Sequence, residues 1–97
     1  MFCIRPLPEF NNWLNRLSDN TLRGIIVSRI KRLERGLPGD VEPVGQGVYE
    51  LRIHFGAGWR VYFSRRESQI IILLAGGSKR TQAQDIKLAK KLNETID

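Results

Sequence analysis

The sequence predicts an α+β fold in which helices form a layer on a curved antiparallel sheet. Three observations lead to this prediction. Residues 47–66 alternate between apolar and polar side chains on both sides of a Gly56-Ala57-Gly58 turn, which indicates a β-hairpin. Two earlier stretches, residues 8–17 and 21–35, repeat apolar side chains at helical spacing. Residues 70–75 are all apolar, which is typical of a strand that is covered on both faces.

The first third of the chain predicts a short strand and two helices. Residues 2–5, of which the first three are apolar, favour a short strand that the following proline ends. A first helix begins at Pro8, because proline followed by glutamate is favoured in a first helical turn. The second helix covers residues 21–35 and ends at a glycine and a proline. Since only a short polar turn separates the two helices, we expect a helical hairpin.

The rest of the chain predicts three strands and a last helix. Residues 37–46 are rich in glycine and proline and predict a loop that leads into the sheet. The hairpin supplies two strands, and the apolar run supplies a third, which we expect to be the innermost one. Residues 81–96 then predict a final helix with its lysines turned outward. The order is βααβββα, and the length predicts a single domain over residues 1–97.

The composition limits the classes of function. The 97 residues carry sixteen basic and ten acidic side chains, a net charge of +6, and eleven of the basic residues are arginines. Arginine pairs bidentately with phosphate, so this bias favours nucleic acid or an acidic protein as partner over a merely basic surface. A single cysteine, with no cluster of His, Cys or carboxylates at metal spacing, predicts neither disulfide, metal nor cofactor. No apolar run approaches a membrane span, so we expect a cytoplasmic protein that does not contact membranes.

The polar face of the hairpin holds the main candidates for function. Side chains two apart share a face of a strand, so Glu50, Arg52, His54, Arg60 and Tyr62 should lie together on an open face. Arg52 and Arg60 occupy neighbouring strands, where paired Cβ atoms are about 5 Å apart. Two cations at that separation repel each other unless an anion lies between them. That anion is either Glu50, in a salt-bridge network on the solvent side of the sheet, or the phosphodiester of a bound RNA.

RNA cleavage without metal needs three kinds of group. The 2′-hydroxyl attacks its own phosphate, so one group must accept its proton, cations must stabilise the charge at phosphorus, and a donor must serve the leaving oxygen. Arg52, Arg60 and Lys79 can stabilise charge, but an arginine titrates too high to carry protons at neutral pH. Tyr62 and His54 are better proton carriers by type, although a lone histidine on a strand is often an ordinary surface residue.

Basic residues also lie outside the hairpin. Lys79 and Arg80 follow Gly76-Gly77 at the exit of the last strand. Arg32 and Arg35 belong to the polar face of the second predicted helix, which is either a solvated face or a surface that contacts phosphate.

Several short motifs, in their order and spacing, resemble those of a known family. The chain resembles the RelE/ParE superfamily of type II toxins, and most closely its phage-derived, HigB-like "addiction module killer" branch. The motifs cover nearly the whole chain: PEFxxWL at 8–14, GDVxPVG at 39–45, ELRI at 50–53, GxGWRVYF at 56–63, GGxK at 76–79, and Gln82 with Asp85-Ile86.

The resemblance implies a RelE-like fold with the element order given above and an activity. It implies ribosome-dependent cleavage of mRNA in the decoding site, blocked by a cognate antitoxin of the helix-turn-helix, HigA-like type. The family's basic catalytic residues map onto Arg52, Arg60 and Lys79. A tyrosine near the C-terminus takes part in cleavage by RelE, but residues 88–97 contain none, so Tyr62 is a candidate substitute. The expected RNA-binding residues are His54, Arg80, Arg32 and Arg35, of which His54 and Arg80 depart from the family pattern.

Two other functions stay open at this stage. The same family includes ParE-like proteins, which bind DNA gyrase and trap cleaved DNA without being enzymes themselves. Alternatively, the chain is an inactive prophage remnant that only binds an antitoxin and, through it, operator DNA.

Overall fold

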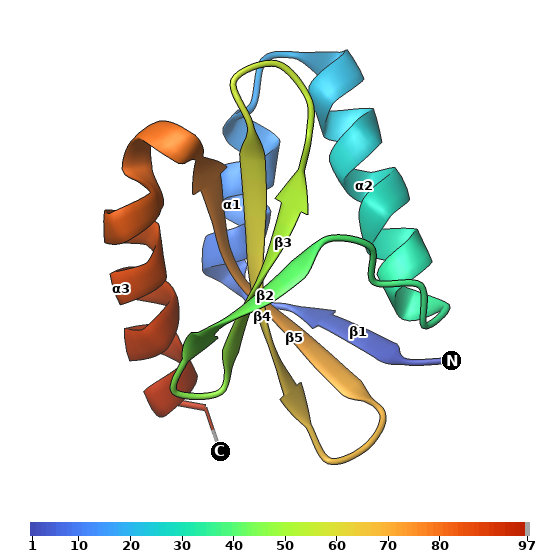
Figure 1. Cartoon of the computed structure of the whole chain (residues 1–97), viewed down its shortest axis with the longest axis vertical. Coiled ribbons are helices and arrows are strands. Elements are labelled where there is room, and N and C mark those ends of the chain that lie inside the picture. Colours follow the sequence, from blue (N-terminus) through green and yellow to red (C-terminus); the bar gives the residue numbers. More distant parts are fainter. Residues whose placement is uncertain (97) are drawn as a thin grey trace.

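A five-stranded sheet forms the centre of the molecule, as the computed structural model of residues 1–96 shows (Figure 1). The strands lie in the order β1-β5-β4-β3-β2. The predicted α+β class is confirmed, with one strand more than predicted. Along the chain the elements are β1 (Cys3–Pro6), α1 (Pro8–Arg16), α2 (Asn20–Glu34), β2 (Val41–Gly45), β3 (Val48–Ile53), β4 (Trp59–Arg66), β5 (Ile70–Ser78), a 3-10 turn (Lys79–Thr81) and α3 (Gln82–Glu94).

The additional strand is β2, within the stretch predicted to be a loop. Val41–Gly45 pairs with β3 in antiparallel orientation and forms one edge of the sheet. Pro43 has no amide hydrogen for a strand ladder, which made this segment look like a loop. An edge strand tolerates such a residue because one side of it needs no partner. The loop prediction for residues 41–45 is therefore wrong.

Two other predictions about the sheet need correction. β1 pairs with β5 in parallel, so the sheet is mixed and not wholly antiparallel. β4 occupies the centre of the strand order, whereas β5, which we expected to be innermost, lies next to the edge strand β1. The apolar run nevertheless gives a strand covered on both faces, because residues 71–77 of β5 are all buried. The first strand begins one residue later than predicted and includes Pro6, again at an edge.

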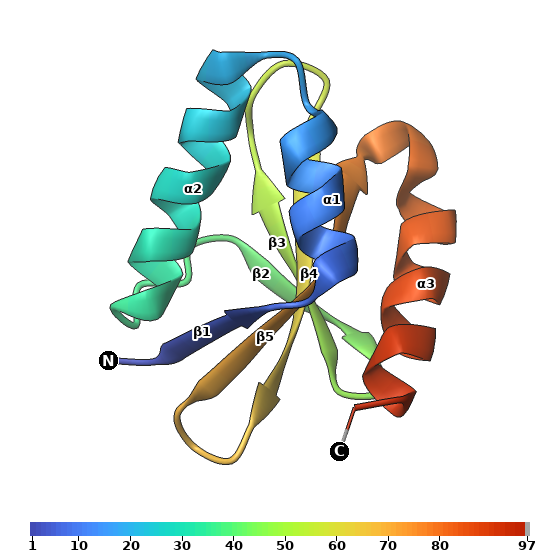
Figure 2. The same ribbon diagram turned by 180° about the vertical axis from the view of Figure 1, so that it is seen from behind.

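The helices cover both faces of the sheet and not one face as predicted. On one face, Phe10 of α1 and Ile26 of α2 belong to a core that includes Val61 of β4 (Figure 2). On the other face, Ala89 of α3 packs with Tyr62 in a second cluster. The face of the hairpin that carries the polar residues is the one that α3 partly covers.

Local signals mark where the first two helices begin. Pro8 is the first residue of α1, as predicted, and the side chain of Asp19 accepts a hydrogen bond of 3.0 Å from the amide of Leu22 at the start of α2. Within residues 1–96, no helix combines the length and the apolar character that crossing a membrane requires.

Helix α1 approaches β5 closely at Gly76. A Cβ atom on Gly76 would lie 2.3–2.6 Å from ring atoms of Trp13, which is too short for any contact. The ring of Trp13 is flanked by Phe10 and Trp59, whose ring centroids lie 5.6 and 6.4 Å away. Glycine at this position therefore lets α1 lie against the sheet.

We predict that Gly76→Ala lowers the free energy of unfolding by about 1–3 kcal/mol, because the added methyl group overpacks the Trp13 contact. Denaturant unfolding followed by tryptophan fluorescence measures the change. Gly24→Ala is the matched control, since a Cβ there meets nothing within 4 Å, and alanine in a helix should stabilise by about 0.5–1 kcal/mol. Equal effects of the two changes would contradict the packing explanation.

Candidate functional site

The β3–β4 hairpin has the predicted register. Arg52 lies directly opposite Arg60, and Glu50 lies directly opposite Tyr62. Leu51 and Val61 point to the face covered by α1 and α2, as the alternation of the sequence predicted. The cross-strand pairing of the two arginines is therefore confirmed.

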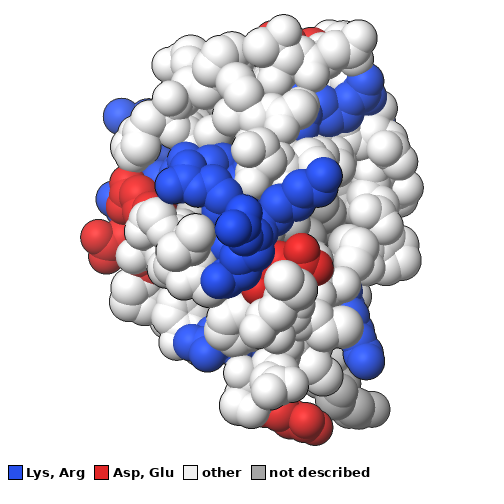
Figure 3. Space-filling model, turned by 90° about the vertical axis from the view of Figure 1, so that its right-hand side faces the viewer, with Lys and Arg blue, Asp and Glu red and all other residues white. Residues whose placement is uncertain are grey.

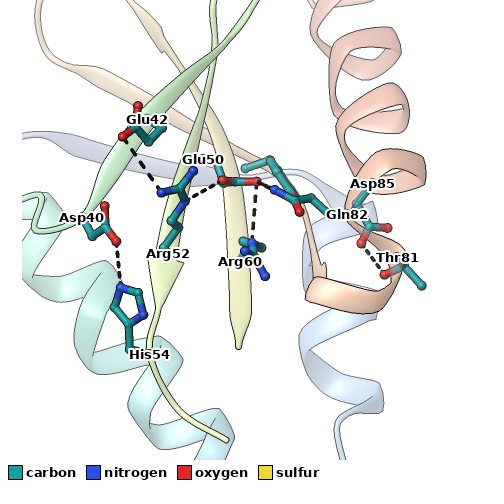
Figure 4. A network of polar contacts seen from close by, with 10 residues as sticks. Asp40, Glu42, Glu50, Arg52, His54, Arg60, Thr81, Gln82 and Asp85 are labelled. Atoms are coloured by element: carbon teal, nitrogen blue, oxygen red, sulfur yellow. Dashed lines mark hydrogen bonds and ion pairs between the residues drawn. The ribbon is translucent and has the colours of Figure 1, made fainter. Parts of the chain in front are cut away.

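The carboxylate of Glu50 lies between the two arginines (Figure 4). Its Oε1 accepts a hydrogen bond of 3.0 Å from Nε of Arg52, and Nε of Arg60 lies 3.7 Å from its Oε2. Oε2 also accepts hydrogen bonds from Nε2 of Gln82 at 2.8 Å and from the hydroxyl of Tyr62 at 3.2 Å. Glu50 is thus the anion that two adjacent arginines require, and the carboxylate raises the pKa of Arg52.

The inner half of this face is closed, which corrects the prediction of an open face. Glu50 and Tyr62 are both completely buried, because α3 covers them and supplies Gln82. Burial, and secondarily the nearby Glu50 carboxylate, raise the pKa of Tyr62 well above that of an ordinary tyrosine. The hydroxyl of Tyr62 therefore stays protonated and faces Glu50 instead of solvent.

The raised pKa of Tyr62 predicts a loss of stability at alkaline pH. Tyrosine in the unfolded chain releases its proton from about pH 10, whereas Tyr62 in the folded protein retains it. The unfolded state then binds fewer protons, so the free energy of unfolding falls as pH rises above this value. Tyr62→Phe should show a smaller fall between about pH 9 and 11 in urea unfolding curves. An unchanged pH dependence in the variant would contradict this prediction.

The outer half of the face opens into a hollow at the β3–β4 turn. The hollow has a volume of about 460 Å³ and brings together the three predicted charge-stabilising residues, Arg52, Arg60 and Lys79. The side chain of Arg60 is only 12% exposed, and its Nε is buried without a hydrogen-bond partner among residues 1–96. The side chain of Arg52 is 37% exposed. The other residues that line the hollow are Ile53, His54, Phe55, Gly56, Ala57, Gly58 and Trp59.

Two closely packed glycines at the end of β5 precede Lys79. Gly76 admits the ring of Trp13 on one face of β5, and Gly77 admits Asp85 on the other, since a Cβ on Gly77 would lie 1.9 Å from Oδ2 of Asp85. The hydroxyl of Thr81 donates a hydrogen bond of 2.6 Å to that Asp85 oxygen, while burial raises the pKa of Asp85. The chain then turns, and the amide of Lys79 donates to the carbonyl of Gly58 at 3.1 Å.

The other predicted RNA-binding residues divide into two groups. His54 lines the hollow, and Arg80 is exposed in the 3-10 turn next to Lys79. Arg32 and Arg35 lie at the C-terminal end of α2, away from the β3–β4 turn (Figure 1). Viewed from the side of α2, basic side chains gather in the middle of the surface, with acidic ones beside them (Figure 3). His54 therefore lines the same hollow as Arg52, Arg60 and Lys79. Arg32 and Arg35 belong to a different part of the surface.

Two residues of the site were not assigned a role from the sequence. Gln82 begins α3 and completes the hydrogen bonds of Glu50. A buried carboxylate needs several hydrogen-bond donors, so burial of Glu50 would have indicated a donor such as Gln82. The sequence does not show that Glu50 is buried. Asp40 precedes β2, and its Oδ2 lies 2.7 Å from Nε2 of His54.

Among residues 1–96, no three His, Cys, Asp or Glu side chains form a group that could bind a metal ion.

Comparisons with known proteins show the family of the chain. Residues 12–95 match the family described as "Phage derived protein Gp49-like (DUF891)". The chain belongs to this Gp49-like family, which is a toxin-like family related to RelE and to addiction modules. A Haemophilus influenzae protein described as "Uncharacterized protein" is 44% identical over 93 residues, which is 96% of this chain and 94% of the relative. The predicted resemblance is thus confirmed at the level of the family, and the HigB-like branch stays a prediction.

Proposed function

We propose that the protein is the toxin of a type II toxin-antitoxin system and cleaves mRNA on the ribosome until a cognate antitoxin blocks it. The observation that carries this proposal is the hollow at the β3–β4 turn, where Arg52, Arg60 and Lys79 meet from three segments of the chain. Membership of a toxin-like family supports the biological role. The HigB-like branch and a helix-turn-helix, HigA-like antitoxin are part of the same proposal.

The arrangement of the cations suits charge stabilisation. Glu50 holds Arg52 and Arg60 in fixed positions, so little reorganisation is needed when a phosphodiester enters. Arg60 and the exposed Lys79 line the same hollow, so both cations face the space that a phosphodiester would enter. Such preorganised donors stabilise the extra negative charge that develops on phosphorus in the transition state.

Tyr62 takes an indirect role in this proposal. Its hydroxyl donates to Glu50 and is completely buried, so it acts by fixing the carboxylate that fixes the arginines. Arg80 extends the positive charge beyond Lys79 toward the RNA backbone. Arg32 and Arg35 form a separate basic surface, which we assign to ribosomal RNA.

Expression in a bacterial host tests the proposal. The protein alone should stop growth and produce new mRNA 5′ ends at codon-related positions, and co-expression of the antitoxin should prevent both effects. Arg60→Ala should relieve both effects as well. Gyrase cleavage complexes without mRNA cuts would instead establish a ParE-like poison. Normal growth in the presence of folded protein would indicate a remnant that only binds its antitoxin.

A further inference from the structure

We propose that His54 is the catalytic residue that accepts the proton of the RNA 2′-hydroxyl, and that Asp40 is the residue that positions it. This inference rests on the proposed function, because it assigns the proton acceptor that the cleavage reaction needs. His54 is 75% exposed in its side chain and lines the same hollow as Arg52, Arg60 and Lys79. A substrate phosphate held by those cations would therefore lie within the same hollow as the imidazole.

The contact with Asp40 determines which nitrogen of His54 is available. Oδ2 of Asp40 lies 2.7 Å from Nε2 of His54, and an ionised carboxylate can only accept hydrogen bonds. Nε2 must therefore carry the hydrogen, which leaves the lone pair of the neutral ring on Nδ1. Figure 4 shows the ring of His54 with one nitrogen directed at Asp40. The other nitrogen is left to act as a base.

Contacts with β3 and α2 involve Asp40 and the residue before it. Its carbonyl oxygen accepts a hydrogen bond of 2.9 Å from the amide of Arg52, which ties the residue to β3. The preceding Gly39 has a φ of +75°, and a Cβ there would lie 2.5 Å from Nη2 of Arg29. The guanidinium of Arg29 thus packs on the loop from α2. The segment before β2 therefore contacts both β3 and α2.

The other titratable groups near the hollow are poorly suited to this step. Glu50 is buried and engaged by several donors, and the hydroxyl of Tyr62 is buried against it. Glu42 is 53% exposed, and its Oε1 lies 4.0 Å from Nη1 of Arg52. It is poorly suited because it faces that arginine and does not line the hollow. The remaining charged groups that line the hollow are Arg52, Arg60 and Lys79, which are cations. Among the described lining residues, His54 alone has a side chain that is commonly neutral and basic near pH 7.

The proposed step is balanced and needs no added reagent. Nδ1 of His54 takes the proton as O2′ forms a bond to phosphorus, and the bond between phosphorus and O5′ breaks. O5′ then gains a proton from solvent. The products are a 2′,3′-cyclic phosphate on one fragment and a 5′-hydroxyl on the other, and no atom is oxidised or reduced.

Cleavage of ribosome-bound mRNA by purified protein tests the role of His54. We expect His54→Ala to slow cleavage by about 10²–10⁴-fold, the usual contribution of a general base. Free imidazole should restore part of the activity of His54→Ala, because the hollow is open, but should not restore Lys79→Ala. A variant that cuts at the wild-type rate, or one that imidazole does not help, overturns this inference alone. Wild-type protein that cuts no mRNA overturns the proposed function, and this inference with it.

A double-variant comparison tests the role of Asp40. Asp40→Asn should slow cleavage in the wild-type background by less than His54→Ala does. It should cause no further loss in the His54→Ala background, because a positioning residue acts only through the residue it positions. A loss of equal size in both backgrounds would show a structural role for Asp40 and overturn its assignment. Thermal unfolding of each variant confirms that the compared proteins are folded.

Discussion

Replacing Glu50 with glutamine should lower the free energy of unfolding by about 3–5 kcal/mol, which is the usual effect of removing one partner from a buried ion pair. Glu50 is completely buried and accepts hydrogen bonds from Arg52, Tyr62 and Gln82. A glutamine keeps the shape but offers one acceptor fewer and turns an amide donor toward these donors. Arg52 and Arg60 would also lose the negative charge that offsets the repulsion between them. Denaturant unfolding at neutral pH measures the effect.

Glu42→Gln is the matched control for this prediction. Glu42 is also a carboxylate near Arg52, but it is 53% exposed and its Oε1 lies 4.0 Å from Nη1 of Arg52. An exposed pair of this kind contributes about 0–1 kcal/mol. If Glu50→Gln proves as mild as Glu42→Gln, the buried carboxylate does not organise the hairpin as we describe.

Replacing Lys79 with alanine should reduce mRNA cleavage by about 10²–10³-fold, the typical loss when one donor to a transition-state charge is removed. The side chain is exposed, and the hydrogen bond of Lys79 to Gly58 is made by its backbone amide, which alanine retains. The free energy of unfolding should therefore change by less than about 0.5 kcal/mol. Rate measurements on ribosome-bound mRNA and denaturant unfolding of the same protein separate the two effects.

Lys87→Ala provides the control for the charge that is lost. Lys87 is exposed on α3 and does not line the hollow. Its replacement removes the same positive charge from the molecule and should leave cleavage within about twofold of the wild type, as expected for a surface change away from the site. Similar losses for Lys79→Ala and Lys87→Ala would mean that net charge, and not the hollow, promotes cleavage.

The hairpin was predictable because one of its faces is apolar and the other is polar. Alternation in residues 47–66 fixed which side chains share a face, and the structure confirms this for Leu51, Val61, Arg52 and Arg60. Alternation does not tell which element covers a face. The burial of Tyr62 under α3 therefore could not be predicted from the sequence.

The contact between His54 and Asp40 depends on β2, the strand that was not predicted from the sequence. Val41 of β2 pairs with Leu51 of β3, which places Asp40 opposite Arg52 and close to His54. Pro43 and the glycines around it favoured a loop, and a loop gives no register. The cations of the site were thus predictable from local pattern, whereas the contact that orients the histidine needed the tertiary structure.

Cleavage in a purified translation system tests the central claim most directly. Wild-type protein should generate discrete new 5′ ends within translated codons, and the same amount of folded Lys79→Ala should generate almost none. The claim would be contradicted if translation continued normally and no new ends appeared in the presence of folded wild-type protein.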